Sequence, residues 1–143
     1  MGADRIPRAI LLDCLGTLVR LEPPAPRLAA ALGIPLVGAQ RAVRAEIAYY
    51  RAHLHEAVDA ASLANLRARC AAVVSDELSL HVDVPTLLAA LVFTPFPDAA
   101  PALERWRARG IRLVVVSNWD VSLHEVLDRT GLSAIVDGAV SSA

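Results

Sequence analysis

Two short apolar runs, about a hundred residues apart, constrain the fold of this 143-residue chain more than any other feature. Residues 9–12 form the first run, which ends at Asp13, and residues 111–116 form the second, which ends at Ser117 and Asn118. Continuous apolar runs are typical of strands buried on both faces of a parallel sheet, although periodicity alone leaves a buried helix open. Their short length favours strands, and we therefore predict two buried parallel strands.

The residues around these runs predict the remaining elements. Apolar positions spaced by three or four residues indicate helices over 27–32, 40–58 and 62–78, and a further helix that begins at 85. A helix with Asp98 as its N-cap precedes the second run, another helix follows it, and residues 134–136 suggest a third strand. This order predicts an α/β fold, a Rossmann-like parallel sheet with right-handed crossovers. We expect an incomplete, discontinuous α/β core at 1–20 and 92–143, and an inserted all-helical domain at 21–91.

Composition excludes several classes of function. The net charge is −1, all 14 basic residues are arginine, and no basic run occurs, so we expect no nucleic-acid partner. No stretch of about 18 apolar residues indicates a membrane span. Cys14 and Cys70 are too few for a disulfide framework, which favours a cytoplasmic location.

Polar side chains follow both predicted strands at the ends where parallel sheets bind ligands. An aspartate such as Asp13 can attack phosphorus or carbon and form an ester, while the hydroxyls of Thr17 and Ser117 can hold oxygens of the transferred group. Simpler roles stay open, because Asp13, Thr17 and Ser117 can also be turn or cap residues, and Asn118 can take a left-handed turn conformation. For Asp120 an N-cap role in the next helix is favoured over catalysis.

Asp-Cys-Leu-Gly-Thr-Leu, residues 13–18, resembles motif I of the haloacid dehalogenase (HAD) superfamily, and Val-Val-Val-Ser-Asn, residues 114–118, resembles motif II. The helical insertion between them resembles the cap of the subgroup whose cap lies between these motifs. The resemblance implies a hydrolase that acts through an aspartyl-enzyme intermediate on a small anionic substrate, phosphorylated or halogenated. It makes Asp13 the nucleophile and, with the backbone carbonyl of Leu15, a ligand of Mg²⁺. Thr17, Ser117 and Asn118 would bind the substrate.

Three departures from the family pattern qualify these roles. Leu15 stands where phosphatase members carry an acid/base aspartate, and the chain contains no lysine for motif III. It also ends at Ser141-Ser142-Ala143, before the acidic pair that completes the magnesium site. We expect the N-terminal portion of a longer protein, inactive alone, with an incomplete Mg²⁺ site and an exposed sheet edge that promotes self-association. A naturally short relative, and a non-catalytic HAD-like binding or regulatory protein, are the alternatives.

Overall fold

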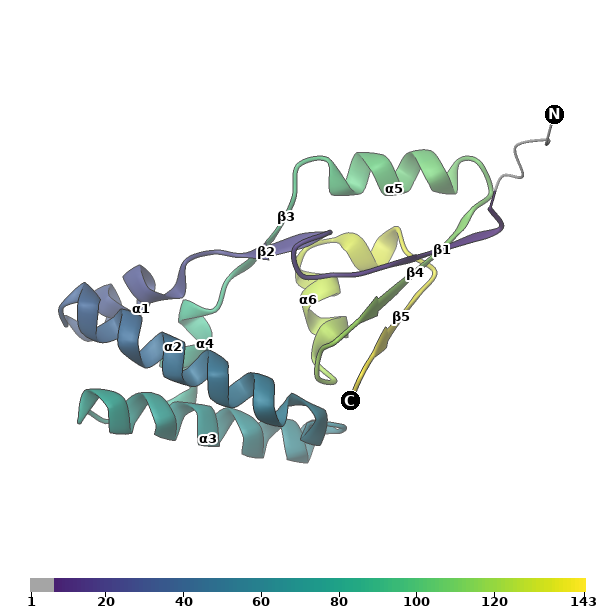
Figure 1. The fold of residues 1–143 in the computed structure, drawn as a ribbon. Coiled ribbons are helices and arrows are strands. Elements are labelled where there is room, and N and C mark those ends of the chain that lie inside the picture. Colours follow the sequence, from purple (N-terminus) through teal and green to yellow (C-terminus); the bar gives the residue numbers. More distant parts are fainter. Residues whose placement is uncertain (1–6) are drawn as a thin grey trace. The chain divides into compact units, whose positions relative to one another are not determined.

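The computed structural model describes residues 7–143, which divide into two compact units (Figure 1). One unit, the α/β unit, comprises the described residues up to Arg20 together with 94–118 and 122–142. The other, the helical unit, comprises Leu21–Phe93, the three residues Trp119–Val121, and Ala143. The sequence pattern assigned residues 119–121 to the α/β part of the chain, but in the structure they belong to the helical unit.

The α/β unit contains a three-stranded parallel sheet with the strand order β1-β4-β5. Both apolar runs form strands of this sheet, and Leu12 is the register partner of Val115. The α/β, Rossmann-like fold class is thereby confirmed. The elements are β1 (Ala9–Leu12), α5 (Ala99–Arg107), β4 (Arg112–Ser117), α6 (Leu123–Arg129), a 3₁₀ turn (Leu132–Ala134) and β5 (Gly138–Ser141).

The prediction of a third strand at residues 134–136 was wrong. Ala134 is the last residue of a 3₁₀ turn, and the strand begins only at Gly138. Asp137 explains the displacement, because it pairs with β4 before the ladder starts. Its N–H donates to the Leu113 carbonyl at 2.8 Å, and its Oδ2 accepts from the Leu113 N–H at 2.7 Å.

The two faces of the sheet differ in exposure. Leu113 and Val115 point to one face and are fully buried, in keeping with the packing of α5 on β4 and α6 on β5. Leu11, Val116 and Val140 lie on the opposite face and are 70%, 42% and 55% exposed. Within residues 7–143, β1 is an edge strand, so this unit presents both an unpaired strand edge and an uncovered apolar face.

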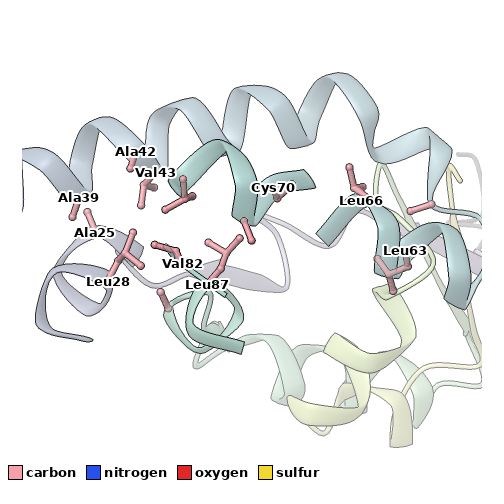
Figure 2. Close-up of a cluster of buried hydrophobic side chains, with 14 residues drawn as sticks. Ala25, Leu28, Ala39, Ala42, Val43, Leu63, Leu66, Cys70, Val82 and Leu87 are labelled. Atoms are coloured by element: carbon pink, nitrogen blue, oxygen red, sulfur yellow. The ribbon is translucent and has the colours of Figure 1, made fainter. Parts of the chain in front are cut away.

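The helical unit is built on two long helices that run side by side (Figure 1). Leu28, Val43, Leu66 and Leu87 are among the buried side chains that pack together between its four helices (Figure 2). Burial of a leucine or valine side chain contributes about 1.5–3 kcal/mol, so this cluster accounts for the coherence of the unit. The helices are α1 (Pro24–Leu32), α2 (Leu36–His53), α3 (Ala60–Leu78) and α4 (Val84–Ala90), with a 3₁₀ turn (Leu54–Glu56) after α2.

Side-chain caps fix where two of these helices begin. At α3, Asp59 and Ser62 form a capping box, in which Asp59 Oδ1 accepts from the Ser62 N–H at 2.8 Å. At α4, Asp83 Oδ1 accepts from the Thr86 N–H at 2.9 Å. Such caps typically stabilise a helix by about 1 kcal/mol, which explains why α3 starts two residues before the predicted position.

The chain passes between the two units through a pair of short strands. These strands are β2 (Val19–Leu21) and β3 (Phe93–Pro95), which pair with one another. Neither strand was predicted, because three residues are too few to show periodicity. No helix within residues 7–143 combines the length and the apolar character that crossing a membrane requires.

Candidate active site

A tight loop follows β1 and starts at Asp13. The buried carbonyl oxygen of Cys14 accepts the N–H groups of Thr17, Leu18 and Val19, at 3.2, 2.8 and 3.0 Å. The chain turns back sharply enough for these bonds because Gly16 adopts a φ of +83°, which a side chain would disfavour. Motif I therefore has a local structural basis, since this glycine allows the loop that displays Asp13.

Asp13 and Ser117 meet at the carboxyl ends of β1 and β4. Ser117 Oγ donates a hydrogen bond to Asp13 Oδ1 at 3.0 Å, although the two residues are 104 positions apart. Ser117 is 7% exposed, whereas Asp13 is exposed. The hydroxyl of Ser117 thus orients the accessible carboxylate of Asp13. Because Ser117 is buried, the movement of both groups is limited.

Thr17 and Leu15 are placed in the same loop but are not joined to Asp13. Thr17 is exposed, and among residues 7–143 no hydrogen bond connects its hydroxyl to the carboxylate. Leu15 is 43% exposed and extends a hydrocarbon side chain at the position two residues after Asp13. The loop therefore offers one carboxylate and one hydroxyl, and no second acidic group.

Sequence reasoning missed one further polar residue at this edge of the sheet. Ser142 follows β5 directly, and its Oγ donates to Asn118 Oδ1 at 2.6 Å. The sequence does not reveal the register of this strand. A third strand at residues 134–136, as the sequence pattern suggests, would not place Ser142 next to Asn118. With β5 at Gly138–Ser141, Ser117 and Ser141 are register partners, and the residues after them are adjacent.

Asp120 does not cap the helix that follows it, in contrast to the sequence-based expectation. Ser122 occupies the N-cap position of α6, and Asp120 is 3% exposed within the helical unit. Its Oδ2 accepts a hydrogen bond from the Tyr50 hydroxyl at 2.8 Å. Because residues 119–121 directly follow Asn118, this bond anchors the segment that leads away from the candidate site.

Cys14 is no candidate for a reactive thiol, although it adjoins Asp13. Its side chain is fully buried, and burial together with the neighbouring Asp13 charge raises its pKa to about 11. A thiol with that pKa is almost entirely protonated near neutral pH, and the thiolate is the nucleophilic form. Of these two adjacent side chains, Asp13 is therefore the candidate nucleophile.

The sequence of the loop, the sheet order and the Asp13–Ser117 contact agree with one family. The family model of haloacid dehalogenase-like hydrolases matches residues 7–143. The chain belongs to this family. A search of curated protein sequences finds no match.

Solved structures of HAD proteins share the fold. An L-2-haloacid dehalogenase from Xanthobacter autotrophicus is 21% identical, with a TM-score of 0.63, over 94% of this chain and 56% of that protein. A second L-2-haloacid dehalogenase is 19% identical, with a TM-score of 0.62, over 94% of this chain and 63% of that protein. A HAD phosphatase from Thermococcus onnurineus is 22% identical, with a TM-score of 0.53, over 94% of this chain and 61% of that protein. The chain thus spans less than two thirds of the length of these relatives.

The donor groups among residues 7–143 do not suffice for a magnesium site. Mg²⁺ prefers six oxygen ligands in octahedral geometry, usually including one or two carboxylates. The described residues contain no group of three or more His, Cys, Asp or Glu side chains that could hold a metal ion. Asp13 and the Leu15 carbonyl alone do not fit the ion.

Proposed function

We propose that this HAD-like hydrolase acts through an aspartyl-enzyme intermediate on a small anionic substrate, either halogenated or phosphorylated. The observation that carries the proposal is the 3.0 Å hydrogen bond from Ser117 Oγ to Asp13 Oδ1 at the carboxyl ends of two parallel strands. A carboxylate that is accessible and held in one orientation is suited to nucleophilic attack.

The proposed reaction has two steps. Because Ser117 holds Oδ1, Oδ2 of Asp13 attacks the carbon or phosphorus atom, and the leaving group departs with the bonding electron pair. An ester or an acyl phosphate on Asp13 results. Water then cleaves this intermediate and restores the carboxylate. The hydroxyl of Thr17 and the amide of Asn118 would bind anionic oxygens of the substrate.

Leu15 favours leaving groups that depart without a proton. A positioned general acid typically accelerates a reaction 10²–10⁴-fold, and a leucine side chain cannot supply one. A halide needs no protonation, and neither does the anion of an acidic alcohol such as a phenol. We therefore favour a halogenated acid, or an activated phosphate ester, over a simple alkyl phosphate.

Replacement of the nucleophile tests the proposal in the complete gene product. Asp13→Asn should reduce turnover of 2-chloropropionate, or of p-nitrophenyl phosphate, to the uncatalysed rate. Asp128→Asn, an exposed carboxylate on α6, is the matched control and should retain activity. Full turnover by Asp13→Asn would show that another group is the nucleophile.

Isotope labelling distinguishes the two substrate classes. During turnover in H₂¹⁸O, attack of water on the acyl carbon of an alkyl ester leaves ¹⁸O in the Asp13 carboxylate, which peptide mass spectrometry detects. Attack of water at phosphorus leaves Asp13 unlabelled and places the label in phosphate. We expect label in Asp13, because Leu15 favours the halogenated substrate.

A second candidate function is ligand binding without turnover, and Leu15 is the observation that favours it. Such a protein would keep the anion-binding groups Thr17 and Asn118 and would bind phosphate or a carboxylate with no product formed. Calorimetric binding of the anion by a protein that shows no turnover with either substrate would support this alternative.

Two further assignments accompany the proposal. The helical unit is proposed as the cap that selects the substrate, on the resemblance of the insertion to family caps. A cytoplasmic location is proposed because Cys14 and Cys70 are free and buried, which suits a reducing compartment.

A further inference from the structure

The bond between Ser142 and Asn118 follows from the register of β4 and β5. Ser117 and Ser141 are partners in the parallel ladder, so the residues that come next, Asn118 and Ser142, leave the sheet side by side. Ser142 Oγ donates to Asn118 Oδ1 at 2.6 Å. Both side chains are exposed and lie at the sheet edge that carries Asp13.

In the structure this bond engages the oxygen end of the Asn118 amide and leaves the nitrogen end for other partners. An asparagine side chain has an oxygen that accepts and an NH₂ group that donates two hydrogen bonds. With Oδ1 engaged by the hydroxyl of Ser142, Nδ2 and its two protons are turned away from Ser142. An amide rotated by half a turn would instead present Oδ1, which repels an anionic oxygen.

Among residues 7–143, the side-chain donors at or after the ends of β1 and β4 include Thr17, Ser117 and Asn118. The chain contains no lysine, so no ammonium group from this sequence can neutralise an anionic substrate. The Ser117 hydroxyl proton is donated to Asp13. The Asn118 amide can therefore supply donors that the engaged Ser117 hydroxyl does not.

We propose that Ser142 is a positioning residue, which holds the Asn118 carboxamide with its N–H groups directed at the anionic group of the substrate. The proposal rests on the proposed function, since it takes this sheet edge as the substrate site. Ser142 itself does not contact the reacting atoms; it acts through Asn118.

Substitutions of Ser142 in the complete gene product test the proposal. Calorimetric titration with inorganic phosphate and with acetate measures anion affinity without any turnover. Ser142→Ala should weaken binding of the preferred anion about 3- to 10-fold, the range expected for loss of one hydrogen bond. Ser142→Thr keeps the hydroxyl and should restore affinity. Ser133→Ala, an exposed serine elsewhere in the α/β unit, should leave affinity unchanged.

A double-mutant comparison separates orientation from general stability. In an Asn118→Ala background, Ser142→Ala should cause no further loss of affinity, because no amide remains to be oriented. Asn118→Asp keeps the acceptor for Ser142 but loses the donor, so it should bind the anion far more weakly than the parent protein. With an active substrate, Ser142→Ala should raise KM and leave kcat nearly unchanged.

Several outcomes would overturn the proposal. One is unchanged anion affinity in Ser142→Ala. Another is a loss of affinity on Ser142→Ala that is as large in the Asn118→Ala background as in the parent protein. The third is the absence of phosphate and acetate binding by the parent protein. Failure of the proposed function looks different: Asp13→Asn would keep turnover, while Ser142→Ala would still weaken anion binding.

Discussion

Removal of the Tyr50 hydroxyl should destabilise the helical unit measurably. Tyr50 lies in α2, and its hydroxyl donates to Asp120 Oδ2 at 2.8 Å. Burial, followed by the charge of Asp120, raises the pKa of Tyr50 well above its usual value, so the hydroxyl is a proton donor throughout the neutral range. Asp120 is 3% exposed, and water has little access to replace the lost donor.

The size of the effect follows from this geometry. Tyr50→Phe keeps the ring and removes one oxygen, so the loss of packing is small. A hydrogen bond to a carboxylate contributes about 1.5–3 kcal/mol, and we expect a loss of about 2 kcal/mol in the free energy of unfolding. For a unit of this size, that corresponds to a decrease in Tm of roughly 10 °C.

Tryptophan fluorescence during urea unfolding of the 143-residue chain measures this loss. Trp119 is 6% exposed, its ring centroid lies 5.0 Å from that of Phe93, and both belong to the helical unit. Trp106 lies in α5 of the α/β unit, so Trp106→Phe should be present in every variant. The Trp119 signal then reports on the helical unit alone.

Tyr49→Phe is the matched control, because it removes the hydroxyl of the adjacent residue. The Tyr49 hydroxyl accepts from Arg69 Nη1 at 3.1 Å, but Arg69 also pairs with Glu56 in an exposed position. Tyr49→Phe should therefore lower the free energy of unfolding clearly less than Tyr50→Phe does. Equal losses at the two positions, or a loss below about 0.5 kcal/mol at Tyr50, would refute the argument from burial.

Three further predictions concern a buried acid, the cysteines and the bare sheet face. Burial raises the pKa of Glu46, and a hydrogen bond with the Cys70 thiol has a smaller opposing effect. The contribution of Glu46 to stability is therefore full at pH 4 and is lost as the pH rises through the pKa of the folded state. Glu46→Gln should match the parent protein at pH 4 and unfold at higher urea at pH 8; equal midpoints at pH 8 would contradict this. Burial is the largest of the effects that raise the pKa of Cys14 to about 11 and that of Cys70 to about 12. Alkylation of both thiols in the native protein should therefore be slow, and rapid labelling without urea would contradict this prediction. Leu11→Ser and Val140→Thr should each reduce self-association of the 143-residue chain in sedimentation velocity, since both apolar side chains are more than half exposed; unchanged sedimentation would exclude this face.

The elements that sequence patterns predicted correctly are those with a continuous local signal. The run that ends at Asp13 and the run that ends at Ser117 both form strands, because uninterrupted apolar residues suit a sheet core. The helix predicted over 27–32 also forms, and it ends at Gly33, whose left-handed conformation is common for a glycine after a helix. The HAD-like fold and the hydrolase family followed from these signals together with the two motifs.

The features that the sequence did not reveal depend on contacts between distant residues. Ser142 became a candidate only when the register of β4 and β5 placed it beside Asn118. Likewise, the bond between Tyr50 and Asp120 joins positions 70 residues apart, while local spacing suggested only a helix cap. Neither pairing leaves a periodic pattern in the sequence.

Register therefore controls both polar contacts of the candidate site. Because Leu12 pairs with Val115, Asp13 leaves β1 beside the last two residues of β4, Val116 and Ser117, and its carboxylate reaches the Ser117 hydroxyl. Asn118 meets Ser142 because Ser117 pairs with Ser141. A shift of one residue in either ladder would turn the polar side chain at the strand end to the opposite face. The burial of alternate β4 residues opposes such a shift, since it would move Leu113 and Val115 into solvent and expose two apolar side chains at about 1.5–3 kcal/mol each. The apolar core of the sheet thus places Asp13 and its partners before any substrate binds, and the loop after β1 contributes the turn that displays the carboxylate.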